Sequence, residues 1–338
     1  MTSRWMRSEC RSMTAHQISS PRIFAGIDIG TLTCRLLIAE LTSSGTLREL
    51  HSDRRILRLG QGVDRDRILR GDAMERVAET LGEWRMVMDR YELAAFTAVA
   101  TSAVRDAENR GEFVRLVRER TGLQVEIISG EEEAHRTVLG IRSGLPSGVS
   151  DVLALDIGGG STEFILDLPN QATMMRSVDI GVVRLCERVL HHDPPTSEEI
   201  RQAREWVRNE TVAAVADLAL PVGLTFVGTA GTITALAAMA QQLPSYEPAR
   251  IHNYCLARTV VQDLESTLLV RTKAERAGLP GLERNREDVI AAGAIILRTV
   301  METVGIPSLL VSDLGLREGV LINLANQVIP QGQANAQH

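Results

Sequence analysis

The sequence predicts an α/β fold of two similar halves that face one cleft. Two segments carry nearly the same turn after an apolar run: Gly26–Thr31 reads GIDIGT and Leu155–Glu163 reads LDIGGGSTE. Apolar strands alternate with amphipathic helices, which favours parallel strands with helical cover. A stretch rich in Gly, Pro and Ser at 143–150 separates two sets of elements. We therefore expect one domain over 23–142 and another over 143–315.

The first half begins with a strand, Ile23–Ile29, that a glycine turn joins to a second strand, Cys34–Leu41. Apolar residues spaced three and four apart predict a helix over Ala73–Arg90. The elements expected after it are the strand Ala94–Ala100, the helix Glu108–Arg120, the strand Gln124–Ser129 and the helix Glu131–Arg142.

The second half begins with three strands in meander order, Val152–Ile157, Glu163–Leu168 and Thr173–Ile180. Thr196 and Glu199 form a capping-box signature that opens a long helix to Leu218. The elements expected after it are the strand Gly223–Gly228, a helix ending near Gln242, the helix Arg286–Val304, the strand Ser308–Val311 and the helix Leu316–Gln327.

Net charge, cysteine spacing and the length of apolar runs exclude several classes of protein. The 338 residues carry a net charge of −6, which argues against a general nucleic-acid binder. The four cysteines form no C-x-x-C pair, and a cytoplasmic location fits best. No apolar stretch reaches the roughly 18 residues that span a membrane. Residues 1–22 lack the apolar centre of a signal peptide and are interpreted as a disordered leader, with Met13 an alternative start, and 330–338 as a disordered tail.

The two repeated turns predict phosphate and metal chemistry. Asp28 and Asp156 each end an apolar strand, and the glycines after them leave backbone N–H groups able to face an anion. Because a carboxylate repels phosphate, the pairing requires a hard cation such as Mg²⁺ between them. Glu163 lies on the return strand and can approach the same cleft if the turn is a hairpin. The alternative is that these residues only form or cap turns.

A third turn, Gly228–Thr232, opens directly into a helix, whose N-terminus favours an anion. A simple capping turn is the alternative. The phosphate-contacting residues expected from the three turns are Gly30, Thr31, Gly158, Gly159, Gly160, Ser161, Thr162, Gly228, Gly231 and Thr232.

Two further segments supply an arginine and an acid. Arg105 follows a strand end, where its guanidinium can hold phosphoryl oxygens, although a surface ion pair is the plain alternative. Glu131, Glu132 and Glu133 start a helix, and three acids in a row exceed what capping needs. One of them beside a phosphate would have a raised pKa, which suits a general base for water.

The ordered motifs resemble those of the exopolyphosphatase/guanosine pentaphosphate phosphohydrolase family from about Ile23 to Asn326. The motifs that match are Asp28-Ile-Gly, Thr101-Ser-Ala-Val-Arg105, Ser129-Gly-Glu-Glu-Glu133-Ala, Asp156-Ile-Gly-Gly-Gly-Ser-Thr-Glu163, Gly228-Thr-Ala-Gly-Thr and Gly315-Leu-Arg-Glu-Gly319.

The resemblance implies two actin-like (ribonuclease H-like) domains around an interdomain cleft, with the terminal helix 316–329 packing on the first. It makes Glu133 the catalytic base and Arg105 the phosphate-binding arginine. Asp156 and Glu163 match the acids that hold Mg²⁺ or align the water, and we add Asp28 to the metal set, with Mn²⁺ an alternative metal. The implied reaction is hydrolysis of a terminal phosphoanhydride by water.

Two departures shape the expected substrate. Leu32 stands where the family usually has a polar residue, often Asn, which removes one possible hydrogen bond to phosphate. The C-terminal domains of long members are absent from this sequence, which favours short polyphosphate or a nucleotide. We expect hydrolysis of inorganic polyphosphate, guanosine pentaphosphate or both by a homodimer. The alternatives are a non-catalytic alarmone or polyphosphate sensor and an ATP-dependent small-molecule kinase of the same fold.

Overall fold

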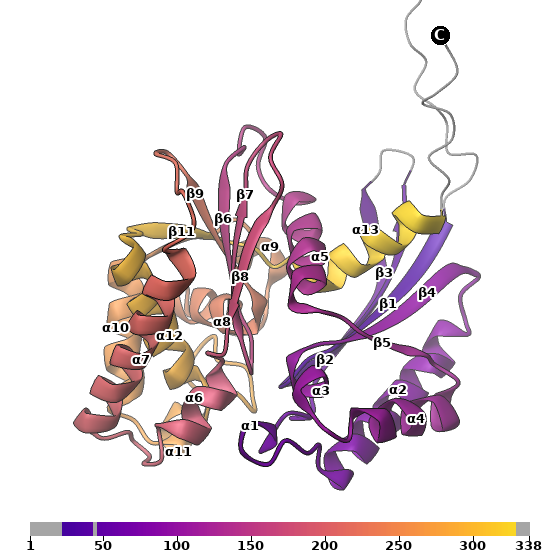
Figure 1. Ribbon diagram of the computed structural model, residues 1–338, viewed down its shortest axis with the longest axis horizontal. Coiled ribbons are helices and arrows are strands. Elements are labelled where there is room, and N and C mark those ends of the chain that lie inside the picture. The colour runs from indigo at the N-terminus through magenta and orange to yellow at the C-terminus, as the bar shows by residue number, and fades with distance from the viewer. Residues whose placement is uncertain (1–21, 43–45, 329–338) are drawn as a thin grey trace, which may run out of the picture.

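The computed structural model describes residues 22–42 and 46–328, and it has two halves, each built on one sheet (Figure 1). The predicted tail and the leader up to residue 21 lie outside these ranges. The first sheet has the order β3-β2-β1-β4-β5. Its strands are β1 (Arg22–Ile29), β2 (Thr33–Leu41), β3 (Leu47–Ile56), β4 (Leu93–Ala100) and β5 (Val125–Ile127).

The second sheet has the order β10-β11-β9-β6-β7-β8. In both sheets an antiparallel meander of three strands is followed by two parallel strands, so β8-β7-β6-β9-β11 repeats the order of the first sheet. The predicted α/β class with two similar halves is therefore confirmed. The strands are β6 (Val152–Ile157), β7 (Thr162–Asp167), β8 (Met174–Val178), β9 (Thr225–Thr229), β10 (Cys255–Ala257) and β11 (Ser308–Val311).

Helices cover both faces of each sheet. In the first half, α2 (Gly71–Met88) and α4 (Arg110–Thr121) bury Trp84 and Phe113 against one face. The other face is covered by α13 (Leu316–Val328), through Leu321 and Ala325. The chain also forms the short helices α1 (Val63–Asp66) and α3 (Ser102–Asp106) here.

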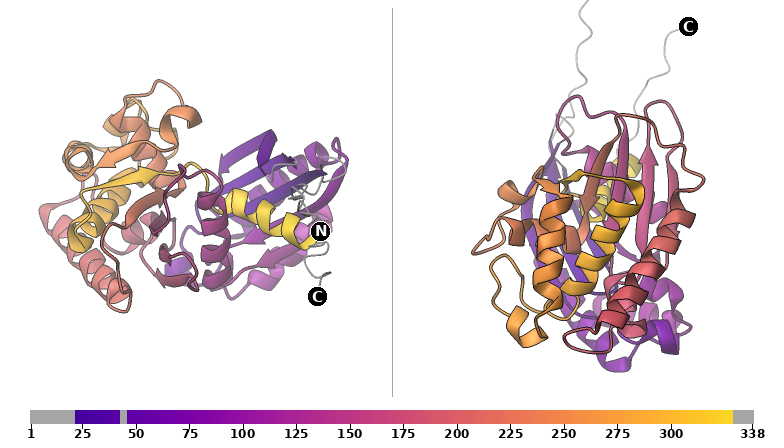
Figure 2. Two further views of the ribbon diagram at one scale, coloured as in Figure 1. Left: turned by 90° about the horizontal axis from the view of Figure 1, so that it is seen from above. Right: turned by 90° about the vertical axis from the view of Figure 1, so that its left-hand side faces the viewer.

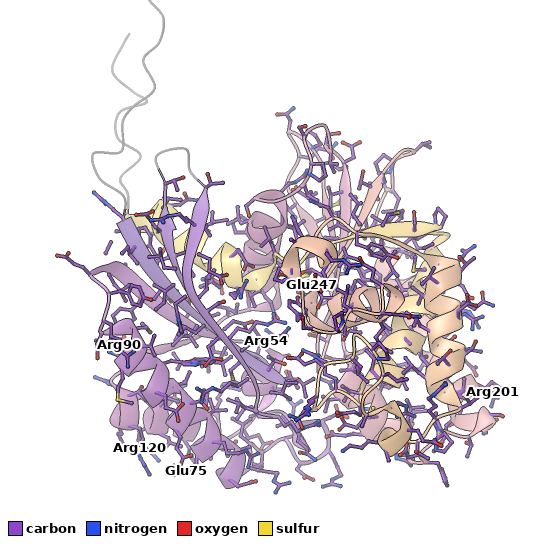
Figure 3. All side chains as sticks on the ribbon, turned by 180° about the vertical axis from the view of Figure 1, so that it is seen from behind. Arg54, Glu75, Arg90, Arg120, Arg201 and Glu247 are labelled. Carbon is purple, nitrogen blue, oxygen red and sulfur yellow. The ribbon has the colours of Figure 1, made fainter. Side chains whose placement is uncertain are left out.

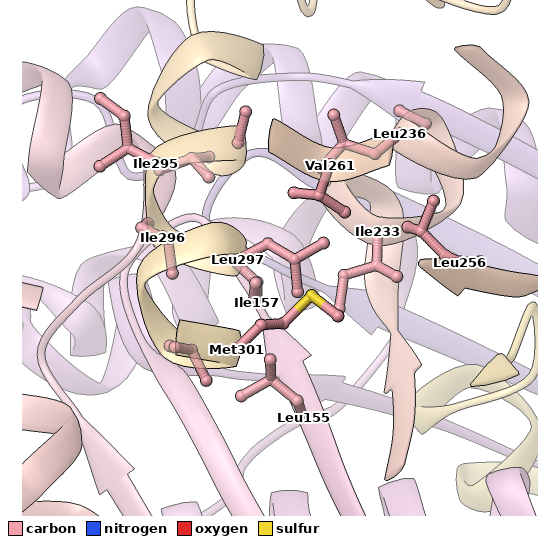
Figure 4. Close-up of a cluster of buried hydrophobic side chains, with 14 of the residues drawn as sticks. Leu155, Ile157, Ile233, Leu236, Leu256, Val261, Ile295, Ile296, Leu297 and Met301 are labelled. Carbon is pink, nitrogen blue, oxygen red and sulfur yellow. The ribbon is translucent and has the colours of Figure 1, made fainter. Parts of the chain in front are cut away.

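In the second half, one face carries the largest core, where Leu155 and Ile157 of β6 meet Leu297 and Met301 of α12 (Figure 4). The other face is covered by α5, whose Val138 belongs to a separate core cluster with β6 and β7. The helices are α5 (Gly130–Arg142), α6 (Val182–Arg188), α7 (Ser197–Val215), α8 (Ala230–Ala240), α9 (Pro248–Ile251), α10 (Arg258–Leu269), α11 (Lys273–Arg276) and α12 (Ile290–Val304).

The helices α5 and α13 lie side by side at the centre of the molecule and join the two halves (Figures 1 and 2). Their backbones approach so closely that a Cβ on Gly319 would lie 1.5 Å from the carbonyl oxygen of Arg136. A Cβ on Gly140 would lie 1.9 Å from that of Gly315. Glycine is therefore required at this crossing. Since α5 contacts both halves, the domain boundary at residue 143 stays a prediction.

The sequence analysis missed several elements. It did not anticipate β3, a charged edge strand without clean apolar alternation, or the short helices α3 and α6. It also missed α10, and it began α12 at Arg286, whereas residues 286–289 precede the helix. None of the described helices is both long and apolar enough to cross a membrane.

Candidate active site

Asp28 lies near the end of β1 with its side chain buried in the cleft. The antiparallel register places Arg35 of β2 opposite it, with Arg35 Nη1 3.7 Å from Asp28 Oδ2. Asp28 Oδ1 has no hydrogen-bond partner within the described ranges. Burial raises the pKa of Asp28 to about 6, while Arg35 opposes the rise. This carboxyl group is thus desolvated and only partly compensated.

Asp156 occupies the matching place at the end of β6. The hairpin on which the expectation for Glu163 depended does form, and it pairs Asp156 directly with Glu163 of β7. The Ser177 hydroxyl donates to Glu163 Oε1 at 2.8 Å. Burial raises the pKa of Asp156 to about 7, and the negative charge of Glu163 adds to the rise. Burial also raises the pKa of Glu163, against hydrogen bonds from Ser161 and Ser177.

The turns that follow the two aspartates touch each other. A Cβ on Gly159 would lie 2.9 Å from the Cβ of Thr31, so a larger residue would push the two turns apart. The Thr31 and Ser102 hydroxyls are 2.9 Å apart and hydrogen-bonded. The β1–β2 turn, the start of α3 and the β6–β7 turn therefore meet at one point of the cleft.

Arg105 and Glu133 form an ion pair between α3 and α5. Arg105 Nη1 donates to Glu133 Oε2 at 3.1 Å and to the carbonyl oxygen of Ile128 at 3.0 Å. Burial raises the pKa of Glu133 well above its usual value, Glu163 adds to the rise, and Arg105 opposes it. A buried carboxyl group with a raised pKa and an adjacent guanidinium has the properties of a general base for water.

The three acids in the first turn of α5 have different environments. Glu132 forms a capping box with Ser129, and Glu131 is exposed. Glu133 alone of the three lines the central pocket.

The predicted residues that line the pocket come from both halves. Arg105 does not line the pocket itself but forms an ion pair with Glu133, which does. Those with direct exposure to the pocket are Asp28, Gly30, Thr31, Glu133, Asp156, Gly158, Gly159, Ser161, Glu163, Gly231 and Thr232.

Three of the predicted phosphate-contacting residues lie outside this lining. A Cβ on Gly228 would meet Ile233 and Leu309, which gives this glycine a packing role in β9. The Thr162 hydroxyl donates to the Ile180 carbonyl oxygen. Gly160 lines a smaller adjoining pocket instead.

Sequence reasoning missed two arginines of the pocket, Arg35 and Arg286. Arg286 packs so tightly on the start of α8 that a Cβ on Gly231 would lie 2.3 Å from its Nη2. Nε of Arg286 donates to Glu283 at 2.8 Å, and Nη2 has no hydrogen-bond partner in the described chain. Burial lowers the pKa of Arg286, which Glu283 opposes. Arg286 precedes α12 without any glycine turn or motif, so no local signal marked it.

The donor set fits a small hard cation. Mg²⁺ is held in proteins by one or two carboxylates together with water and substrate phosphates. Within the described ranges, no three His, Cys, Asp or Glu side chains are grouped to hold a metal by themselves. The unpartnered Asp28 Oδ1 and the buried Asp156 line one pocket, so these two carboxylates could hold such a cation.

Acidic strand ends and glycine turns from the two α/β halves thus line one pocket, with an Arg–Glu ion pair beside it. The comparisons agree. Residues 37–328 match the model of the Ppx/GppA phosphatase family, and the chain belongs to this family. The resemblance inferred from the motifs is confirmed, and with it the actin-like fold.

Several relatives cover nearly the whole chain. Exopolyphosphatase 2 of Mycobacterium tuberculosis is 36% identical, over 89% of this chain and 98% of its own. The crystal structure of the Aquifex aeolicus Ppx/GppA member has a TM-score of 0.78 at 33% identity, covering 91% of this chain and 99% of its own. A structure described as an exopolyphosphatase-like protein has a TM-score of 0.85 at 30% identity, covering 91% and 99%.

Proposed function

We propose that this phosphatase is an exopolyphosphatase that releases the terminal phosphate of inorganic polyphosphate, with guanosine pentaphosphate as a further substrate. The relatives named as exopolyphosphatases support the polyphosphate substrate. The observation that carries the proposal is the partly buried Arg105–Glu133 ion pair, whose Glu133 lines the same pocket as Asp156 and Glu163. Such a pair suits hydrolysis, since it supplies both a base for water and a cation for phosphoryl oxygens.

The chain's own groups divide the reaction between them. Glu133 accepts the proton of the attacking water as the bond to the terminal phosphorus forms. The Arg105 guanidinium and the backbone N–H groups of Gly159, Gly160 and Ser161 offset the charge on the phosphoryl oxygens. The phosphoanhydride bond on the far side of phosphorus breaks, and the remaining chain leaves with the bridging oxygen.

A divalent cation would complete the charge balance of this site. Asp28 and Asp156 are the residues that would hold Mg²⁺ or Mn²⁺, with Glu163 opposite Asp156 in the register. When bound, the cation neutralises phosphate oxygens that the carboxylates would otherwise repel.

A second cavity, of about 490 Å³, supports a nucleotide substrate. It adjoins the first pocket at Arg35 and Asp156. Its lining contains three arginines and six carboxyl side chains, a balance that disfavours a long polyanion: Arg35, Arg54, Arg317, Glu49, Asp53, Asp156, Glu283, Asp313 and Glu318.

This cavity also contains a flat surface suited to a base. The guanidinium of Arg54, labelled in Figure 3, stacks over the Tyr246 ring with 4.6 Å between Arg54 Cζ and the ring centroid. Aromatic rings and guanidinium planes are the groups on which nucleobases stack in proteins. The uncharged base of a nucleotide therefore suits this cavity better than a continued phosphate chain does.

The testing experiment measures phosphate release from polyphosphates of several lengths, guanosine pentaphosphate and ATP, with and without Mg²⁺. We expect Mg²⁺-dependent release from short polyphosphate and guanosine pentaphosphate. Absence of release from every substrate would overturn the hydrolase proposal. Tight binding without turnover would instead identify a sensor, and ADP formation that requires a small-molecule acceptor would identify a kinase.

A further inference from the structure

Arg184 is a buried arginine of α6 that lies beneath the β6–β7 turn, outside the pocket of the proposed reaction. Its side chain is 6% exposed. Nε donates to the carbonyl oxygen of Gly160 at 2.8 Å. The guanidinium also pairs with carboxylates of the first half, so one side chain contacts both halves of the molecule.

The contacts of α6 orient the backbone of the turn. The Val182 N–H donates to the Gly158 carbonyl at 3.1 Å, and the Val183 N–H donates to the Gly159 carbonyl at 2.9 Å. The Arg184 Nε bond to Gly160 continues this row. Three successive carbonyl groups of the turn therefore point toward α6.

The opposite groups of the same peptides are the phosphate donors. In a planar trans peptide, the N–H points away from the preceding carbonyl group. The N–H groups of Gly159, Gly160 and Ser161 consequently point away from α6, and within the described ranges they donate to no protein acceptor. The bond from Arg184 fixes the last of these peptides, the one that ends in the Ser161 N–H.

The other end of Arg184 reaches the helix of the catalytic arginine. Nη2 lies 3.0 Å from Asp106 Oδ2, and Asp106 directly follows Arg105 in α3. Nη1 pairs with Asp64 of α1, and the exposed Asp179 lies 3.5 Å from Nη2. Both Asp64 and Asp106 belong to the first half, whereas Gly160 belongs to the second.

We infer that Arg184 is a positioning residue for the proposed hydrolysis: it holds the phosphate-binding N–H groups of the β6–β7 turn in alignment with Arg105. This inference rests on the proposed function. The guanidinium fork is required, because the ammonium of lysine is a point donor that cannot match the Gly160 carbonyl and the two carboxylates in the same planar geometry. The role is exerted through Gly160 and Asp106, since Arg184 itself does not line the catalytic pocket.

The test compares Arg184→Met with Arg188→Met in the full chain. Arg188 lies on the same helix and pairs with Asp64 at 2.5 and 2.7 Å, and within the described ranges it makes no hydrogen bond or ion pair with the turn. Steady-state phosphate release from short polyphosphate with Mg²⁺ gives kcat and KM for each. We expect Arg184→Met to lower kcat on the order of 10- to 100-fold with a much smaller change in KM, since misplacement by about 1 Å costs this much. Arg188→Met should stay within about twofold of wild type.

Two further variants keep the inference testable if Arg184→Met does not fold. Asp106→Asn weakens only the link to the Arg105 helix and should lower kcat, while Arg184→Lys should fail to restore the wild-type rate. The inference is overturned if a folded Arg184→Met or Asp106→Asn protein keeps wild-type kcat, or if Arg188→Met loses as much. If the wild-type chain releases no phosphate, the proposed function falls and this inference falls with it.

Discussion

The two turns at the cleft follow the same strand order but carry different chemistry. In the first half the strand-end Asp28 faces Arg35, whereas in the second half Asp156 faces the acid Glu163. The first turn carries the apolar Leu32, which packs into the core of the second half, while the second turn presents consecutive glycines. The same strand order thus carries an aspartate partly compensated by an arginine in the first half, and an aspartate paired with a second acid beside a glycine-rich turn in the second half.

The largest effect is expected at Glu133, the proposed base, which lines the pocket that both turns share. Replacing Glu133 with Gln keeps the shape but removes proton acceptance, so kcat for phosphate release should fall on the order of 10² to 10⁴-fold. Glu132→Gln is the matched control, because Glu132 caps the same helix. Wild-type turnover in Glu133→Gln would remove Glu133 from the role of base.

Removing the charge of Asp28 and of Asp156 in separate variants tests whether the two aspartates differ in function. Asp156 faces another acid while Asp28 has Arg35 nearby, so we expect the second turn to depend more on the cation. Asp156→Asn should raise the Mg²⁺ concentration for half-maximal activity on the order of 10- to 100-fold, a range typical of perturbed metal sites. Asp28→Asn should raise it less. Equal shifts in the two Mg²⁺ titrations would show that the turns are equivalent.

A larger residue at the close crossing of α5 and α13, which joins the two halves, should destabilise the protein. A methyl group at Gly319 would collide with the Arg136 backbone, so Gly319→Ala should lower the free energy of unfolding by about 1–3 kcal/mol. Gly82→Ala in α2 has room for the added methyl group and should raise it by about 0.5–1 kcal/mol. Denaturant unfolding measures both, and a neutral Gly319→Ala would contradict the close crossing.

Leu32 offers a way to make the first turn more like a polar phosphate loop. An Asn at this position adds one donor to the pocket that Leu32 lines, and a hydrogen bond contributes about 0.5–1.5 kcal/mol, so KM should fall roughly 2- to 12-fold. The substitution also removes an apolar side chain from the core, so the melting temperature should drop. An unchanged KM would show that the Leu32 position does not contact substrate.

The smallest effect is a pH dependence of stability at the capping box of α7. Burial would raise the pKa of Glu199, but hydrogen bonds from His192 and from backbone N–H groups outweigh it and lower the pKa to about 2. Because the folded pKa is depressed, this stabilisation is present above the unfolded pKa of about 4.3 and is lost as pH falls toward 2. Between pH 6 and pH 2, the free energy of unfolding should therefore decrease less in Glu199→Gln than in wild type, as measured by denaturant unfolding at each pH.

Local sequence signals predicted the strand ends and the residues carried on them. The spacing of Asp156 and Glu163 placed both at one site on condition that the turn is a hairpin, and the observed register pairs them on one face. The excess of acids over capping needs indicated one of Glu131, Glu132 and Glu133, and the family resemblance selected Glu133. Arg35 opposes Asp28 through strand register, while Arg184 and Arg286 reach the site through tertiary packing. Such contacts leave no pattern in the local sequence. The charged strand β3 was missed for a similar reason, because it is a strand through its pairing with β2 and not through an alternation of apolar residues.

We propose that water, activated at the pocket between the two halves, attacks the terminal phosphorus. Hydrolysis of short polyphosphate in ¹⁸O-labelled water, followed by mass spectrometry of both products, shows which phosphorus atom the water attacks. We expect one ¹⁸O atom in each released orthophosphate and none in the shortened chain, with Glu133→Gln lowering the rate of incorporation. Label in the remaining chain, or released phosphate without label, would contradict it.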